Sequence, residues 1–325
     1  MKVSSKYILR EGYRMKNLLI DCDPGHDDAL ALIAALANPE HFTVLGITTI
    51  GGNQTLKKVT DNAKNVLSFL NVEVPLASGQ AGPLVKALQT APEAHGASGM
   101  DGPYFDGADY PICSTNGVQF LAETILKTNE PVTLVALGPL TNIALLIKNY
   151  PEVLPLVEEI SLMGGGLHHG NQTPLAEFNI YVDPDAAEIV FQSGIPIIMS
   201  GLDVTEKAEI TVTEIEQLKN KGKVSHLAYE LLSFYNQSGR QFGFIDSPIH
   251  DLCAIVYLLK PEIFEGSFAD IHVITDESPA RGLTYGDFRR IASADKNTFV
   301  LKEVHREKFV EVLKNALAWF DSQGQ

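Results

Sequence analysis

Apolar and polar residues alternate along the chain with two different periods. Short apolar runs that are typical of buried strands occur at residues 17–22, 42–49, 74–77, 132–137, 159–163 and 196–200. Segments with helical apolar spacing lie between them, at residues 26–37, 55–70, 115–128, 139–149 and 184–192. Strands that alternate with helices favour a parallel sheet covered by helices on both faces. The pattern therefore predicts an α/β fold with a single open, mostly parallel, Rossmann-like sheet.

The later part of the chain has a different pattern. Residues 211–260 read as helical, with a loop at 239–248. A strand at 298–301 and a helix at 304–321 follow. No internal repeat or proline-rich linker divides the chain, so we expect one domain over residues 15–325 with a helical C-terminal elaboration. Residues 1–14 read as an N-terminal extension, with Met15 as an alternative start.

Composition narrows the class of protein and of partner. The chain has 325 residues, of which 45% are hydrophobic and 20% charged, as in a globular protein. Its net charge of −15 disfavours nucleic acid and acidic membrane surfaces as partners. Three widely spaced cysteines predict neither a disulfide framework nor a zinc site, which favours a cytoplasmic location. No apolar run reaches the ~18 residues of a membrane span, and the first residues lack the apolar core of a secretory signal.

Four aspartates lie close together in the segment LLIDCDPGHDDALAL (residues 18–32): Asp21 and Asp23 at the end of the first predicted strand, and Asp27 and Asp28 at the start of the next helix. Such crowding raises carboxyl pKa values unless another charge compensates. A helix N-terminus contributes only about 0.3–1 kcal/mol per carboxylate, which is too little for four. A bound hard cation would suffice, and oxygen ligands favour Ca²⁺ or Mg²⁺ over zinc. One or two of these aspartates could instead be ordinary helix N-caps.

Polar, glycine-rich junctions follow other predicted strands as well. They include Gly51-Gly52-Asn53, Leu137-Gly138-Pro139 and the run Met163-Gly164-Gly165-Gly166. Any one of them could be a simple turn, because turns need Gly and Asn. Ligands of open α/β sheets bind beyond the carboxyl ends of the strands. Together with the aspartates, the junctions therefore predict one ligand site at that edge.

Five motifs in register resemble those of the inosine–uridine-preferring nucleoside hydrolases. In chain order they are DCDPGHDDALAL, GGNQT, LGPLTNIAL, MGGG…GN…AEFN and PIHD, from about residue 17 to the C-terminus. The resemblance implies hydrolysis of the N-glycosidic bond of purine or pyrimidine ribonucleosides, such as inosine, uridine or cytidine. It also implies one Ca²⁺ per chain, a role in nucleoside salvage and a homodimer or homotetramer.

The resemblance also assigns roles to residues of this chain. Calcium would be held by oxygen atoms of Asp23, Asp28, Leu137 (through its main-chain carbonyl) and Asp251. The ribose and its surroundings would be contacted by Asp27, Asn53, Asn171, Glu177, Phe178 and Asn179. Phe178 would form an aromatic wall, although a core residue beside the site is the alternative.

Two residues would carry the chemistry. Breaking the C1′–N bond builds positive charge on the sugar and negative charge on the base, which oxygen ligands around the ribose would accommodate. Asp23 would accept the proton of the attacking water, and His250 would donate a proton to the departing base. His95 resembles a loop histidine that approaches the base in pyrimidine-leaning members, and residues 235–245 resemble a base-side loop. His168 and His169 have no assigned role and are expected in an exposed loop.

Two alternatives remain. Asp21-x-Asp23 also resembles the first motif of haloacid-dehalogenase-like phosphatases, but Gly25 stands where that motif has Thr or Val. The later motifs of that class are not evident. A catalytically silent nucleoside-binding protein is the second alternative, and the presence of all four proposed calcium ligands argues against it. The preferred base does not follow from the sequence.

Overall fold

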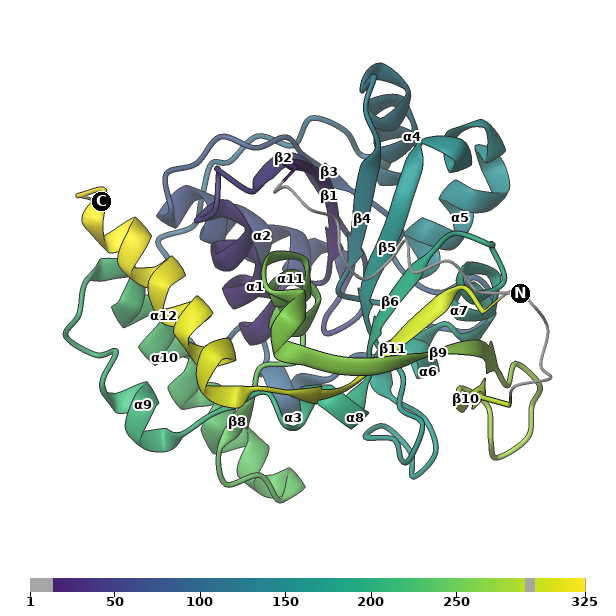
Figure 1. Cartoon of the computed structure of the whole chain (residues 1–325). Coiled ribbons are helices and arrows are strands. Elements are labelled where there is room, and N and C mark those ends of the chain that lie inside the picture. The colour runs from purple at the N-terminus through teal and green to yellow at the C-terminus, as the bar shows by residue number, and fades with distance from the viewer. Residues whose placement is uncertain (1–13, 290–295, 325) are drawn as a thin grey trace.

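The computed structural model describes residues 14–289 and 296–324. Within these residues, one sheet contains the strands β1 (Lys16–Cys22), β2 (Phe42–Thr49), β3 (Leu76–Ser78), β4 (Val132–Ala136), β5 (Val157–Met163), β6 (Ile197–Ser200), β9 (Phe264–Val273), β10 (Thr284–Asp287) and β11 (Thr298–Val304). Their order is β10-β9-β11-β6-β5-β4-β1-β2-β3. Figure 1 shows this sheet in the middle of the molecule. In this spatial order, the strands β11, β6, β5, β4, β1, β2 and β3 run parallel to one another. Strand β9 pairs antiparallel with β10 and β11. The expected open, mostly parallel sheet is confirmed.

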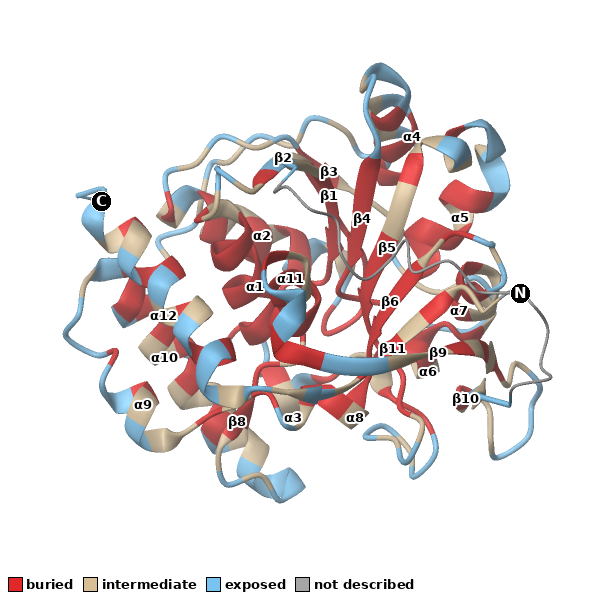
Figure 2. Cartoon of the chain, viewed as in Figure 1, coloured by how far each residue is buried: buried red, intermediate tan, exposed pale blue. Residues whose placement is uncertain are grey.

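Helices cover both faces of the sheet. They are α1 (His26–Leu36), α2 (Leu56–Phe69), α3 (Pro92–His95), α4 (Gly117–Lys127), α5 (Thr141–Asn149), α6 (Phe178–Val182), α7 (Pro184–Phe191), α8 (Leu202–Thr205), α9 (Val212–Glu216), α10 (Lys223–Gly239), α11 (Leu252–Leu259) and α12 (Arg306–Ser322). One core lies under α1, α2, α10, α11 and α12, and the other lies under α4, α5 and α7. The period-two alternation of β1 explains this division, because Leu18 and Ile20 enter the first core and Leu19 enters the second. Figure 2 shows the buried sheet between helices whose outer faces are exposed.

The strands predicted at residues 17–200 and the helices between them are all present, with ends displaced by no more than two residues. The C-terminal helices, the loop near residue 240 and the last strand and helix are present too. The strands β9 and β10 were not predicted, because only four of the ten residues of β9 are buried and its sequence FEGSFADIHV lacks a continuous apolar run. Residues 1–13 of the expected N-terminal extension lie outside the described residues. In the part of the chain that the structure describes, no helix is both long and apolar enough to cross a membrane.

The sheet leaves a crevice at the carboxyl end of β1. From β1 the chain proceeds outward to β2 and β3, and it then returns to β4 on the opposite side of β1. The connections that follow β1 and β4 therefore diverge, which is where ligands bind in sheets of this kind. The aspartates after β1 and the Leu137-Gly138 junction after β4 both lie at this point.

The C-terminal helix α12 is anchored to α9 by a shared carboxylate. Glu214 accepts hydrogen bonds from Arg306 (2.7 Å) and Lys314 (3.0 Å) and forms a capping box with Thr211. Burial opposes ionisation of Glu214, but the bonds from Arg306, Thr211 and Lys314 outweigh it and lower the pKa to about 2. The anchor therefore stabilises the fold fully above about pH 4.5, and this contribution is lost as the pH falls toward 2.

Replacing Glu214 tests this anchor. Glu214→Gln should lower the free energy of unfolding at pH 7 by about 1–2 kcal/mol, since it removes an ionised, partly buried partner. Urea unfolding at pH 7 and pH 3 should show the difference from wild type shrinking at the lower pH. Glu216→Gln, on the exposed face of the same helix, is the matched control and should change the free energy by less than about 0.5 kcal/mol. An equal loss at both pH values would exclude a role for the Glu214 charge.

Candidate functional site

Asp23 follows β1 and is enclosed by the chain. Its Oδ2 accepts the backbone N–H of Asn53 at 2.6 Å, and its side chain is buried. A Cβ on Gly52 would lie 2.1 Å from this Oδ2, and a Cβ on Gly138 would lie 2.5 Å from Oδ1. The junctions after β2 and β4 therefore need glycine, because the Asp23 carboxylate approaches both backbones too closely for a side chain.

Three further carboxylates converge beside Asp23. Oxygen atoms of Asp27, Asp28 and Asp251 lie within 4.8 Å of one another, and all three residues are buried. Asp28 accepts the backbone N–H groups of Gly25 (2.9 Å) and Asp23 (3.1 Å). Asp27 and Asp28 lie in the first turn of α1, and Asp251 immediately precedes α11, so two helix N-termini face the cluster.

The electrostatics of this cluster favour a bound cation. Burial first, and then the neighbouring carboxylates, raise the pKa of Asp27 to about 7 and raise the pKa of Asp251 well above its usual range. Among the described residues, no Lys or Arg forms an ion pair with these aspartates. A donor set made of buried carboxylate oxygens suits a hard divalent cation such as Ca²⁺. The residues present therefore fit the metal that the sequence predicts.

The cluster of Asp27, Asp28 and Asp251 differs in part from the calcium ligands that the resemblance predicts. It contains Asp27, which the resemblance assigns to ribose, and it does not contain Asp23. The carbonyl oxygen of Leu137 accepts a hydrogen bond from Asn179 Nδ2 at 2.7 Å. A carbonyl has a second lone pair, so this bond is compatible with a metal contact. The assignment of Asp23, Asp28, Leu137 and Asp251 as ligands stays a prediction.

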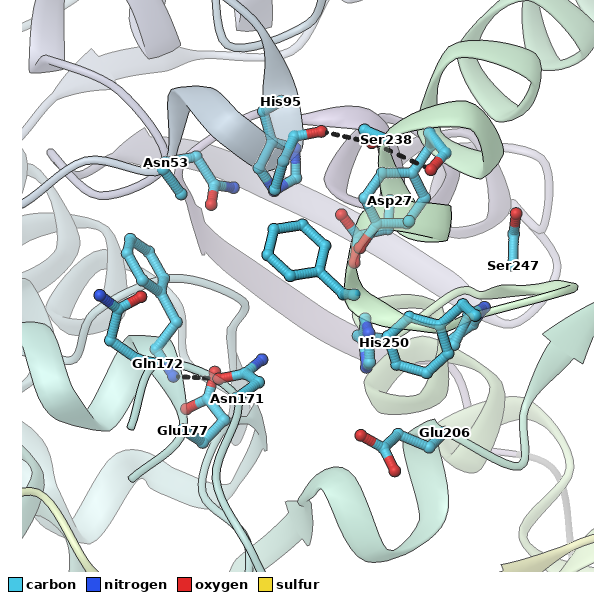
Figure 3. A pocket seen from close by; sticks show the side chains of 18 of the residues that line it. Asp27, Asn53, His95, Asn171, Gln172, Glu177, Glu206, Ser238, Ser247 and His250 are labelled. Atoms are coloured by element: carbon cyan, nitrogen blue, oxygen red, sulfur yellow. Dashed lines mark hydrogen bonds between the residues drawn. The ribbon is translucent and has the colours of Figure 1, made fainter. Parts of the chain in front are cut away.

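A cavity of about 510 Å³ opens in front of the cluster (Figure 3). Residues predicted for the site make up much of its wall: Asp27, Asn53, His95, Leu137, Asn171, Glu177, Phe178, Asn179, His250 and Asp251. Asp23 and Asp28 are the predicted residues that are not part of this wall. The sequence motifs, which are spread over more than two hundred residues, therefore converge on one cavity.

The wall opposite the aspartates is a hydrogen-bonded unit. Glu177 caps α6, and its two oxygens accept the N–H groups of Asn179 (2.9 Å), Gly165 (2.9 Å) and Ile180 (3.1 Å). Gly165 has a φ of +78°, a conformation that favours glycine. Asn171 Oδ1 accepts the Phe178 N–H at 2.9 Å, which leaves its amide NH₂ available to a ligand. These bonds hold the polar groups of this wall in fixed positions.

Asn53 is more constrained than expected. Its side-chain NH₂ donates to the Asp23 carbonyl (3.2 Å) and to Asp28 Oδ2 (3.3 Å). The amide therefore orders the acidic loop, and its side-chain oxygen is the group that is left to contact a sugar hydroxyl.

Two histidines flank the cavity from the side of α10. His250 Nδ1 lies 2.7 Å from the Thr205 hydroxyl, and burial lowers the pKa of His250 to about 4. Burial lowers the pKa of His95 well below its usual value, and the nearby His26 and His250 lower it further. Both imidazoles are therefore neutral at pH 7.

Some residues of the site, among them His169, Glu206 and His26, were not predicted from the sequence. His169 is exposed, as expected, but it also lines the cavity, where its Nε2 lies 3.0 Å from both carboxylate oxygens of Glu206. His168 is exposed and pairs with Asp203. Glu206 belongs to no motif, so no signal in the sequence could have found it. His26 lies inside the aspartate motif DCDPGHDDALAL, and this position could have marked it as a residue near the site.

Comparisons with known proteins agree with this geometry. Residues 18–311 match the model of the family described as inosine-uridine preferring nucleoside hydrolase. The chain is 43% identical over 307 residues to the pyrimidine-specific ribonucleoside hydrolase RihA of Escherichia coli O81 (strain ED1a), covering 93% of this chain and 98% of that protein. It resembles a plant nucleoside hydrolase, PpNRh1, with a TM-score of 0.88, 30% identity and coverage of 94% and 99%. It also resembles the purine-preferring ribonucleoside hydrolase from Gardnerella vaginalis, with a TM-score of 0.89, 29% identity and coverage of 95% and 100%.

The glycine contacts of Asp23 can be tested by adding a methyl group. Gly138→Ala should displace the Asp23 carboxylate and lower kcat/KM for nucleoside hydrolysis at least ~100-fold, as a displacement of about 1 Å does at other active sites. Steady-state kinetics and a thermal melt would separate this effect from unfolding. Gly82→Ala, whose Cβ would lie 3.3 Å from its nearest neighbour, Leu88, is the matched control. Wild-type kinetics for Gly138→Ala would contradict the proposed importance of the Asp23 position.

Proposed function

Because the chain belongs to the inosine–uridine-preferring nucleoside hydrolase family, we propose that it is a Ca²⁺-dependent ribonucleoside hydrolase that prefers pyrimidine nucleosides. The observation that carries the proposal is the buried cluster of Asp27, Asp28 and Asp251 at the base of the cavity. The pyrimidine preference is supported by the 43% identity to the pyrimidine-specific RihA. A role in nucleoside salvage and a homodimeric or homotetrameric assembly are further predictions from the resemblance, and a cytoplasmic location is a prediction from the cysteine pattern.

The acidic side of the cavity would act on the water and on the sugar. Ca²⁺ bound there would offset the carboxylate charge and orient the attacking water and the ribose hydroxyls. Asp23, which Asn53 and two glycine backbones hold in place, would take the proton of this water. Asp27 lies on the cavity wall and would accept a ribose hydroxyl proton in a hydrogen bond.

The opposite wall would respond to the charge that develops on the sugar. As the C1′–N bond breaks, positive charge spreads over C1′ and the ring oxygen. Glu177 and the amide groups of Asn171 and Asn179 line the cavity and are already held by backbone hydrogen bonds. Groups fixed before the reaction stabilise such charge without reorganising.

His250 would assist the departing base. Only the doubly protonated ring can give up a proton without becoming an imidazolate, so His250 would take up a second proton before the bond breaks. Nδ1–H would then donate to the Thr205 hydroxyl, and the proton on Nε2 would pass to the base as negative charge builds on it. The overall reaction is balanced, because water supplies a hydroxyl to C1′ and, through Asp23 and His250, a proton to the base.

A substrate panel tests the proposed function. The purified protein should release free base from uridine and cytidine with a higher kcat/KM than from inosine, adenosine or guanosine. A phosphate-release assay with phosphate monoesters should show no turnover, which separates this function from a haloacid-dehalogenase-like phosphatase. Nucleoside binding without base release would instead support a silent binding protein.

The sugar contacts predict discrimination against deoxynucleosides. Removing the 2′-hydroxyl would leave buried polar groups such as Asp27 and Asn53 without partners, which is strongly unfavourable. We expect kcat/KM for 2′-deoxyuridine to be at least ~100-fold below that for uridine. Comparable values for the two substrates would refute the assignment of these residues to the ribose.

The role of His250 depends on the leaving group. His250→Ala should lower kcat on uridine by about 10²–10⁴-fold, the usual contribution of a general acid. Cleavage of p-nitrophenyl riboside releases p-nitrophenolate, a stable anion that needs no proton, so the variant should cleave this substrate almost as fast as wild type. Thr205→Val, which removes the hydroxyl at Nδ1, should reproduce part of the effect.

Bound calcium must be measured on the same His250→Ala sample, because His250 precedes a proposed ligand. With the metal retained, an equal loss on both substrates would make His250 a structural residue rather than an acid.

A further inference from the structure

His26 is a buried residue of the aspartate motif that the proposed reaction does not use. It is the first residue of α1, and its ring is fully buried. The ring stacks on Phe234, at a centroid distance of 5.1 Å, and on Tyr235, at 5.4 Å. Its Nε2 lies 2.7 Å from the carbonyl oxygen of Asp101, and its Nδ1 lies 3.2 Å from Nδ1 of His95. This line of contacts connects the Asp101 backbone to a residue of the cavity wall.

These contacts determine which nitrogen atoms carry protons. A carbonyl oxygen only accepts hydrogen bonds, so Nε2 of His26 carries a proton and donates it. In a neutral ring, Nδ1 of His26 is then an acceptor, and the bond between the two rings requires a proton on Nδ1 of His95. A neutral His95 with this proton has a bare lone pair on Nε2. Both rings are buried, and among the described residues neither forms an ion pair with a carboxylate, so nothing in their surroundings holds a charged ring.

The bare nitrogen belongs to a ring that lines the substrate cavity. Among the described residues, His95 Nε2 has no hydrogen-bond partner, although the His95 side chain forms part of the cavity wall. Figure 3 shows His95 with Asp27 and His250 around the same space. The ring is held firmly, because a Cβ on Gly25 would lie 2.5 Å from its Nδ1. The cavity therefore presents a fixed acceptor on this side.

We propose that His26 is a positioning residue that fixes the tautomer of His95, so that His95 offers an unprotonated Nε2 to an N–H donor of the nucleobase. This inference rests on the proposed function, because it assumes that a base enters the cavity. The ligand class is a base whose edge carries an N–H group, such as the ring N3–H of uracil. His95 then recognises the base and does not protonate it, which leaves the proton transfer to His250.

The tautomer can be read directly by long-range ¹H–¹⁵N NMR of protein labelled at histidine. In wild type, His95 should be protonated at Nδ1 and bare at Nε2, and His26 should show the opposite arrangement. In His26→Phe, which keeps an aromatic ring in the stack, His95 should shift toward the Nε2–H form. Phe234→Leu is the matched control, since it weakens the stack without touching the hydrogen bonds, and it should leave the His95 tautomer unchanged. A wild-type His95 protonated at Nε2 would overturn the proposal. This outcome is read on the wild-type protein, so it does not depend on whether a variant folds.

Kinetics test the consequence for specificity. Uridine has one N–H donor on its base, and 3-methyluridine has none. His26→Phe should lower kcat/KM for uridine by about 10–100-fold, mostly through KM, and should leave 3-methyluridine nearly unchanged. Equal losses on both substrates would mean that His26 has only a structural role. If the wild-type protein hydrolyses no nucleoside, the proposed function fails, while the NMR result still decides the tautomer.

Discussion

The burial of several carboxylates at one point is the constraint on which the rest of this structure depends. Asp27, Asp28 and Asp251 meet at the carboxyl end of β1, and Asp23 lies against them. Two helix N-termini face the cluster, yet a helix N-terminus offsets at most about 2 kcal/mol in favourable geometry. Unpaired charges buried in protein cost more than this, so the cluster needs a partner of opposite charge. A hard cation fits this place for two reasons. It prefers oxygen ligands, and it would also bind the sugar hydroxyls and the attacking water.

The surrounding architecture follows from this constraint. Gly52 and Gly138 leave room for the Asp23 carboxylate, and Asn53 donates to both Asp23 and Asp28. The reversal of strand order between β1 and β4 supplies the crevice. On the opposite wall, the Glu177 carboxylate caps a helix and accepts hydrogen bonds from backbone N–H groups. These hydrogen bonds fix the wall that would face the ribose. The cavity thus has an acidic side built for a cation and a rigid polar side built for a sugar.

The sequence predicted the parallel part of the fold because each of its strands is a short, continuous apolar run between helical segments. It did not predict β9 and β10, which lie at one edge of the sheet and mix buried residues with partly or fully exposed ones. Most of the site could be assigned because its residues follow strands directly, as Asn53 and Leu137 do. The contact between His26 and His95 could not be assigned, since it joins residues 69 positions apart through packing against α10. Glu206 was not predicted because it belongs to no strand-end motif, and His169 lies within the MGGG…GN motif but was given no role.

The central claim is that the buried carboxylates hold one Ca²⁺ at the base of the cavity. The most direct measurement is an anomalous difference map from crystals of active protein grown with calcium, recorded at a long wavelength. We expect one strong peak per chain, surrounded by carboxylate oxygens of Asp23, Asp28 and Asp251 and by the Leu137 carbonyl. A map without a peak at this position, with the carboxylates in direct contact in an enzyme that remains active, would contradict the account.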